Sequence, residues 1–172
     1  MKTYIVLFRG INVGGNNILP MKELVSLLKQ HQFESVSSYI QTGNIVLKFN
    51  SDPQTKLEQL VNEHYDFKPQ TFVLTDEAFL QAKSKNPYVN SEGKFVHFYF
   101  CKNTDKINLA KLAELKIDSE EYQVINNVLY LHAPDGIGRS KLAAKIETCI
   151  GAPTTARNLN TINKIATMLA NS

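Results

Sequence analysis

The chain has 172 residues, of which 43% are hydrophobic and 20% charged, and its formal net charge is +3. Nine Phe and seven Tyr, together with many aliphatic residues, exclude a disordered chain, because they bury enough apolar surface to offset the entropy of the unfolded state. No apolar run approaches the roughly 20 residues that a membrane-spanning helix needs. We therefore expect a cytoplasmic protein with no membrane partner.

Residue spacing argues against metal and disulfide chemistry. Cys101 and Cys149 are too few and too far apart for a disulfide framework or a zinc site, and no histidine lies in an HExxH pattern. A typical nucleic-acid-binding protein carries a concentrated positive face, and a net charge of +3 is too small to indicate one. We expect neither a metal nor a cofactor.

The first part of the chain alternates between strand and helix patterns. The apolar run at 2–8 predicts a buried central strand, and Pro20 opens a segment with apolar residues at helical spacing. Residues 36–49 predict two strands around the turn Thr42-Gly43-Asn44. The pattern thus begins as strand, helix and hairpin.

A second helix and a fourth strand complete this pattern. Asp52 is a predicted N-cap, because Pro53 follows it at the start of the helix, and residues 71–74 predict the strand. The resulting order β-α-β-β-α-β is that of the ferredoxin-like fold. The second half of the chain repeats this order, with a strand at 94–101, a helix at 109–115, a hairpin at 122–132, a helix at 140–150 and a strand at 154–157.

The repeated order predicts an α+β protein of two ferredoxin-like (βαββαβ) subdomains in tandem plus a C-terminal helix. We place the N-terminal subdomain at 1–76 and the C-terminal subdomain, with the terminal helix, at 94–172. Residues 77–93 are predicted to be a linker with a short helix around Phe79 and Leu80. The repeat concerns the order of elements and not the identity of residues.

Three polar turns that contain glycine are candidates for a binding site. The first, Arg9–Asn17, carries glycines that permit positive φ, and its backbone N–H groups can cradle an anion, although a tight connection needs glycine equally. The fingerprints GxGxxG and GxxxxGK[ST] are absent. The second turn, Gln41–Asn44, is an ordinary hairpin signal.

The third turn, Asp135–Lys141, is the strongest anion-binding candidate. Ser140 can cap the following helix, and Arg139 and Lys141 place two cations beside free backbone donors. Ordinary helix capping explains the same residues equally well. Arg157 and Asn158, at the end of the last predicted strand, can add a guanidinium and an amide.

These segments resemble the motifs of a large bacterial family that is catalogued only as domain of unknown function 1697. The similar segments are RGINVGGN from Arg9, YIQTGN from Tyr39, GRSKL from Gly138 and TARN from Thr155, and they extend over nearly the whole chain. The resemblance implies two ferredoxin-like subdomains and no known activity. Leu159 stands where the family usually has tryptophan, which puts any stacking role of that indole in doubt.

The resemblance groups the polar residues into one candidate set. Polar loop residues are candidates for a site in a way that core positions are not. We hypothesise that the loops converge on a phosphate-bearing or nucleotide-like ligand. The candidate residues are Arg9, Gly10, Asn12, Gly14, Gly15, Asn16, Gln41, Asn44, Arg139, Ser140, Lys141, Arg157 and Asn158.

Three other functions are open at this point. Alternation along 94–101 puts Phe95, His97 and Tyr99 on one side of a strand, where single-stranded nucleic acid can stack. A transferase can use the arginines to hold phosphate, although no nucleophile with a nearby base is evident. Exposed sheet edges can also pair between chains. Whether the protein is an enzyme, and its oligomeric state, remain open.

Overall fold

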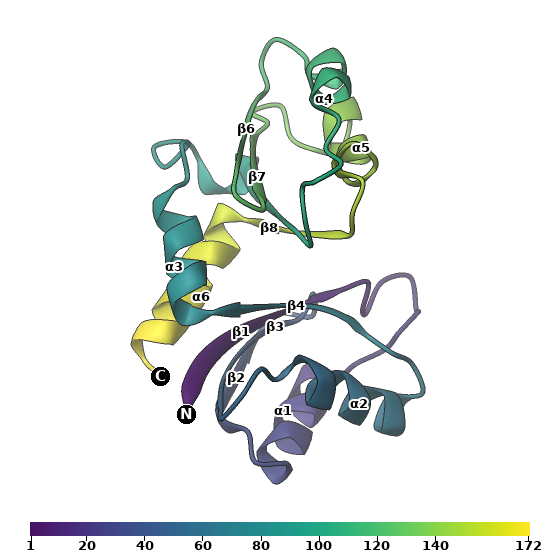
Figure 1. Cartoon of the computed structure of the whole chain (residues 1–172), viewed down its shortest axis with the longest axis vertical. Helices are drawn as coiled ribbons and strands as arrows, with labels where there is room; N and C mark the ends of the chain where they lie inside the picture. Colours follow the sequence, from purple (N-terminus) through teal and green to yellow (C-terminus); the bar gives the residue numbers. More distant parts are fainter. The chain divides into compact units, whose positions relative to one another are not determined.

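The computed structural model describes all 172 residues (Figure 1). By its contacts the chain divides into two compact units. Unit 1 comprises Met1–Gln81 and Lys164–Ser172, and unit 2 comprises Ala82–Asn163. The domain boundaries that we predict after residues 76 and 93 stay a prediction; by contacts, the C-terminal residues group with unit 1.

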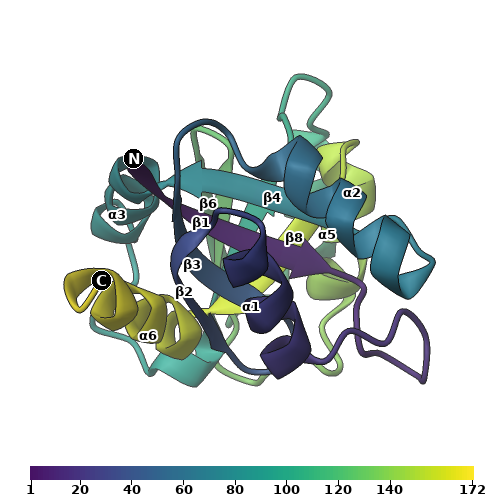
Figure 2. The same cartoon turned by 90° about the horizontal axis from the view of Figure 1, so that it is seen from below.

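Unit 1 is a four-stranded antiparallel sheet with two helices on one face (Figure 2). The strand order β2-β3-β1-β4 is the ferredoxin-like order, and the apolar run predicted to be central is β1. Its elements are β1 (Lys2–Arg9), α1 (Met21–Gln30), β2 (Glu34–Tyr39), β3 (Asn44–Phe49), α2 (Gln54–Tyr65) and β4 (Gln70–Thr75).

Unit 2 repeats this architecture, with the strand order β6-β7-β5-β8. Its elements are a 3-10 turn (Gly93–Phe95), β5 (Val96–Cys101), α4 (Leu109–Leu115), β6 (Glu121–Ile125), β7 (Val128–His132), α5 (Lys141–Ile150) and β8 (Thr154–Asn158). The helices α3 (Asp76–Ser84) and α6 (Leu159–Ala170) each carry residues of both units. The tandem α+β fold predicted from the sequence is confirmed.

One predicted boundary is wrong. The strand expected at 94–101 begins at Val96, because Gly93–Phe95 close a 3-10 turn in which the Phe95 N–H donates to the Glu92 carbonyl at 3.0 Å. The other predicted helices and strands agree with the structure within the usual uncertainty of element ends, but α2 begins at Gln54, so its N-cap is Pro53 and not the predicted Asp52, whose Oδ1 accepts from the Gln54 N–H at 2.9 Å. No helix is both long and apolar enough to cross a membrane.

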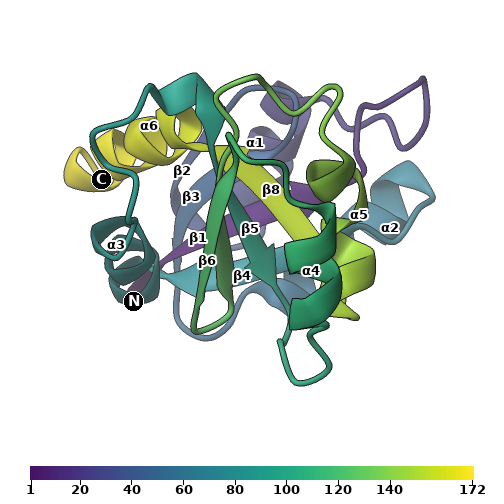
Figure 3. The same cartoon turned by 90° about the horizontal axis from the view of Figure 1, so that it is seen from above.

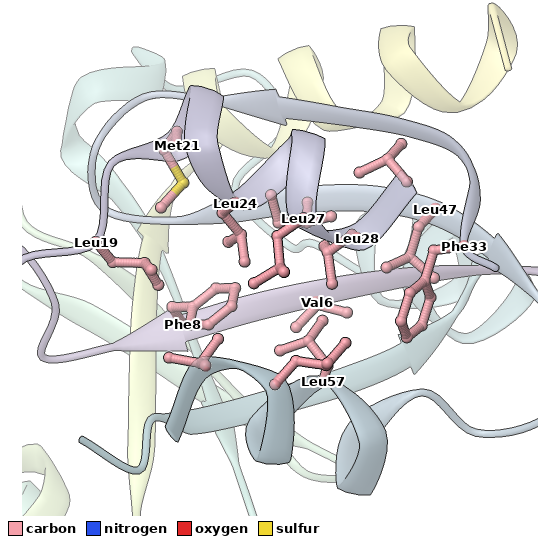
Figure 4. Close-up of a cluster of buried hydrophobic side chains, with 14 of the residues drawn as sticks. Val6, Phe8, Leu19, Met21, Leu24, Leu27, Leu28, Phe33, Leu47 and Leu57 are labelled. Atoms are coloured by element: carbon pink, nitrogen blue, oxygen red, sulfur yellow. The ribbon is translucent and has the colours of Figure 1, made fainter. Parts of the chain in front are cut away.

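The core of unit 1 forms where apolar faces of β1, α1 and α2 meet (Figure 4). Val6 and Phe8 alternate along β1 toward the helices, Leu24 and Leu28 repeat at helical spacing, and Leu57 approaches from α2. All five side chains are at most 1% exposed. Burial of this size stabilises the unit by roughly 1.5–3 kcal/mol per large side chain.

Gly43 is the position at which this packing leaves room for no side chain. A Cβ there would lie 2.7 Å from Ile11 Cδ1 and 2.7 Å from Phe8 Cβ, and the residue has φ +90°. Its carbonyl accepts from the Phe8 N–H at 2.9 Å and so extends the pairing of β1 with β3. Glycine is therefore required here both for space and for backbone conformation.

We expect Gly43→Ala to lower the free energy of unfolding by about 2–4 kcal/mol, from overpacking and backbone strain together. Urea unfolding followed by circular dichroism measures the change. Gly138→Ala is the matched control, because a Cβ at Gly138 meets no atom within 4 Å and its φ is not positive. We expect the control to stay within about 0.5 kcal/mol of the parent. Equal stability of both variants contradicts the packing argument.

Candidate functional site

The loop after β1 contains a small β-hairpin, here called the glycine hairpin, at residues 12–17. Val13 and Asn16 form a bridge, and the Asn16 N–H donates to the Val13 carbonyl at 3.0 Å. Gly14 and Gly15 lie between them with φ +58° and +75°, the signs that a type I′ turn requires. These two glycines are therefore needed to turn the chain. In Figures 1 and 2 this purple loop extends away from the sheet.

Asn12 joins this hairpin to the turn between β2 and β3. Its Nδ2 donates to the carbonyls of Leu19 at 3.0 Å and Gln41 at 2.8 Å, and its Oδ1 accepts from the Leu19 N–H at 2.7 Å. Both amide hydrogens and the amide oxygen are thus used inside the unit. Asn12 has φ +56°, a conformation that asparagine tolerates better than most residues. The residue acts as a structural clasp between two loops.

The other predicted residues of unit 1 are also engaged in the fold or exposed at its surface. Asn44 is fully buried, and its Nδ2 donates to the Tyr39 carbonyl at 3.0 Å. Arg9 donates to Gln70 Oε1 at 3.3 Å, across the β1–β4 pair. Asn16 is exposed and its side chain makes no hydrogen bond. Asn17, which no sequence motif indicated as a candidate, donates from Nδ2 to the Gly10 carbonyl at 3.1 Å.

In unit 2, the segment Ala133–Ser140, here called the α5 loop, leads into α5 through two tight turns. The Gly136 N–H donates to the Ala133 carbonyl at 2.9 Å, and the Ser140 N–H donates to the Ile137 carbonyl at 3.2 Å. Ser140 is the N-cap, since its Oγ accepts from the Ala143 N–H at 3.0 Å. The capping role predicted for Ser140 is confirmed.

Two cations flank this cap. Arg139 and Lys141 are exposed, and neither side chain makes a salt bridge or hydrogen bond within the chain. The backbone N–H of Lys141, in the first turn of α5, likewise has no acceptor in the chain. Asp135, the one carboxylate of the α5 loop, accepts from Ser119 Oγ at 2.7 Å. The start of α5 thus presents two positive side chains and a backbone donor to solvent.

Arg157 and Asn158 contribute to the fold. Arg157 is 7% exposed, and its Nη1 donates to Thr155 Oγ1 and to the Ala156 carbonyl, each at 2.8 Å. Burial lowers its pKa to about 10, so the side chain is still protonated at neutral pH. Asn158 Oδ1 accepts from the Thr161 N–H at 3.0 Å and caps the start of α6. The predicted residues therefore fall into one group in each unit, and their convergence on a single site stays a prediction.

The buried thiols and the histidine of β5 lack the setting of a reactive group. Burial raises the pKa of Cys101 to about 11 and raises that of Cys149, which disfavours the thiolate in both. Burial lowers the pKa of His97, whose Nε2 is enclosed without a hydrogen-bond partner. No group of three or more His, Cys, Asp or Glu side chains is arranged to hold a metal ion.

Comparisons with known proteins agree with this fold. A family model described as a protein of unknown function (DUF1697) matches residues 1–130, so the motif segments from Gly138 onward lie beyond the matched range. The chain is similar to a solved structure, the conserved bacterial protein SP0830 from Streptococcus pneumoniae, with 27% sequence identity and a TM-score of 0.70 over 98% of each chain. No curated protein matches. The resemblance inferred from the motifs is confirmed.

We expect Asn12→Asp to destabilise unit 1 by about 1–3 kcal/mol, because a carboxylate cannot donate to the carbonyls of Leu19 and Gln41. The substitution keeps the side-chain volume and the acceptor for the Leu19 N–H. Asn16→Asp is the control, since this exposed residue lies in the same hairpin. Chemical unfolding of both variants measures the difference. A destabilised control beside an unchanged Asn12→Asp would show that the clasp is unimportant.

We also expect both cysteines to resist a thiol reagent such as DTNB in the folded protein at pH 8. Their pKa values are raised, and both side chains are buried. The thiols should react at once when the protein is unfolded in guanidinium. Rapid stoichiometric reaction of the native protein, measured by absorbance, would instead indicate an accessible nucleophile.

Proposed function

We propose that this chain, which belongs to the DUF1697 family of proteins of unknown function, binds a small phosphate-bearing or nucleotide-like anion in unit 2, at the N-terminus of α5. The observation that carries the proposal is the pair Arg139 and Lys141, two exposed cations without an intramolecular partner on either side of the Ser140 cap. Unpaired cations at this position have an anion as their natural counterpart.

The backbone adds to the attraction. The N-terminus of an α-helix carries about half a positive charge from its aligned peptide dipoles, and its first N–H groups point outward. Ser140 Oγ satisfies the Ala143 N–H, whereas the N–H of the exposed residue Lys141 has no acceptor. A phosphate oxygen can accept from this N–H while the Arg139 guanidinium donates in bidentate fashion. Lys141 then supplies a further point charge.

Gly138, the residue before Arg139, also supports an anion site at the start of α5. Gly138 has an ordinary negative φ, and a Cβ there would meet no atom within 4 Å, so neither conformation nor packing requires glycine. A side chain at Gly138 would project into open space. The missing side chain lets a ligand approach the backbone closely. Asp135 opposes binding electrostatically, but its carboxylate is held by Ser119, and the two cations outnumber it.

The other functions considered from the sequence have less support. Base stacking needs exposed rings, whereas on the predicted face of Phe95, His97 and Tyr99 the last two are buried and Phe95 is half-buried. A transferase that holds phosphate with the same cations would need a positioned acid or base. The only carboxylate of the α5 loop is Asp135, which is engaged with Ser119. Simple anion binding needs no such group.

The test is titration calorimetry at low ionic strength with inorganic phosphate and with adenosine monophosphate as probes. We expect Arg139→Ala to weaken binding about tenfold to a hundredfold, because a hydrogen bond between charged groups contributes roughly 1.5–3 kcal/mol. Lys85→Ala is the control, since Lys85 is exposed, makes no salt bridge and changes the net charge equally. The fold should be unchanged in both variants by circular dichroism.

Two outcomes would contradict the proposal. The first is the absence of any binding heat or thermal stabilisation with either probe at low salt, where exposed charges are least screened. The second is equal loss of affinity in Arg139→Ala and Lys85→Ala, which would indicate a general effect of net charge. A loss confined to Arg139→Ala supports the site.

A further inference from the structure

We infer that the open edge of β6 pairs with β6 of a second copy of this chain, in antiparallel register around Gln123. The inference concerns an interaction surface and is independent of the proposed anion site. It rests on how the outer strands of the two sheets are protected. Unpaired strand edges are templates for pairing with another chain, and most proteins block them.

The outer strands of unit 1 are both modified. The register of β2 against β3 shifts between Glu34 and Ser37, and Ser35 between them has φ +50°, so β2 is bulged. A bulge twists an edge strand away from further pairing. On β4, the carbonyl of Thr71 accepts from Gln54 Nε2 at 3.1 Å. A side chain thus caps one outward group of β4, whereas the outward-facing backbone groups of Val73 have no such partner.

In unit 2, the edge of β8 is protected in the same way. The N–H of Thr154 donates to Glu147 Oε1 at 2.8 Å, and the carbonyl of Ala156 accepts from Arg157 Nη1 at 2.8 Å. Thr154 and Ala156 are the outward-facing residues of β8, since Lys102 pairs with Pro153 on the inner side. Of the four backbone groups that these two residues turn outward, the Thr154 N–H and the Ala156 carbonyl therefore already have side-chain partners.

β6, the outermost strand at the other side of this sheet, has no such protection (Figure 3). The Cys101 N–H donates to the Asn127 carbonyl, and the Ala133 N–H donates to the Phe95 carbonyl, so odd-numbered residues of β7 face β5. The even-numbered residues of β7 then pair with the odd-numbered residues of β6. The backbone groups of Tyr122 and Val124 consequently point outward.

These outward groups have no partner in the chain. Neither Tyr122 nor Val124 makes a hydrogen bond beyond the β6–β7 pair. The strand has five residues, and none of them is proline, lysine or part of a bulge. The flanking Glu120 N–H is bonded to the Ile117 carbonyl at 3.1 Å, which limits the open edge to these two residues.

A second copy of the same strand complements this edge. Under a two-fold axis through Gln123, the N–H and C=O of Tyr122 meet the C=O and N–H of Val124 of the second copy, and the reverse pair follows by symmetry. Tyr122 and Val124 pack against the helix-covered core on one face, while Gln123 is exposed on the other. In the joined sheet, the core-facing side chains of both copies therefore lie on the same face, and the backbone hydrogen-bonding groups also match.

The charges on the strand are compatible with this register. The residue on the axis, Gln123, is neutral, and its amide can bond to Gln123 of the second copy. Glu121 lies opposite Ile125 of the second copy, so no carboxylate faces another directly. Because the interface is a short strand edge, we expect a weak dimer that depends on protein concentration.

The test is sedimentation equilibrium of the full chain from about 10 μM to about 1 mM. We expect dimer formation by the parent protein and at least about tenfold weaker dimerisation of Gln123→Lys, because like charges then face each other at the axis. A mixture of Gln123→Lys with Gln123→Glu should restore dimers, since opposite charges meet. Gln59→Lys, an exposed change on α2, is the control and should dimerise as the parent does.

Three results would overturn the inference. They are a parent protein that is monomeric at every concentration, a Gln123→Lys variant that dimerises as well as the parent, and a charge-reversed mixture that fails to recover dimers. Thermal unfolding of each variant at low concentration checks that Gln123, which is exposed, has been changed without loss of the fold. Pairing through β6 is supported when each single variant dimerises weakly and the mixture of Gln123→Lys with Gln123→Glu dimerises as the parent does.

Discussion

The hydrogen bonds of the Asn12 side-chain amide hold the first candidate loop in place. This amide binds both backbone groups of Leu19 and the carbonyl of Gln41, and so holds two loops together that are far apart in the sequence. Asn12 is half-buried, and an amide whose donors and acceptor are all satisfied has little to offer a ligand. The polar residues of the glycine hairpin are therefore mainly structural. Gly43 also has a structural role, because it packs closely against Phe8 and Ile11.

The corresponding loop of unit 2 uses its polar residues differently. Ser140 satisfies one backbone N–H of α5, as an N-cap does, but Arg139 and Lys141 on either side have no partner. Exposed cations that stabilise nothing in the fold have room for a function. The two loops thus differ in their hydrogen bonds: the side-chain amides of Asn12 and Asn17 are used within the fold, whereas the cations of the α5 loop are open to solvent.

Much of the fold was predictable because its signals are local. Apolar periodicity located the strands and helices, and capping chemistry located Ser140, whose partner Ala143 is three residues away. The clasp by Asn12 was not predictable, since its partner Gln41 is distant in sequence and asparagine in a glycine-rich loop has several uses. The hydrogen bonds of Glu147 and Arg157 to the outer edge of β8 were not predictable for a similar reason, since they form only when the strand has taken its place in the sheet. The start of β5 was misplaced because Lys94 and Phe95 suit a strand as well as a turn.

The central claim is that the glycine hairpin is structural and that the α5 N-terminus is the anion site. A titration with inorganic phosphate, followed by ¹H–¹⁵N correlation spectra of the labelled protein, tests it most directly. We expect shifts for the backbone amides of Arg139, Ser140 and Lys141, and unchanged signals for the side-chain amide of Asn12 and the backbone amides of Gly14 and Gly15. Shifts at the glycine hairpin with none at the start of α5 would contradict the claim.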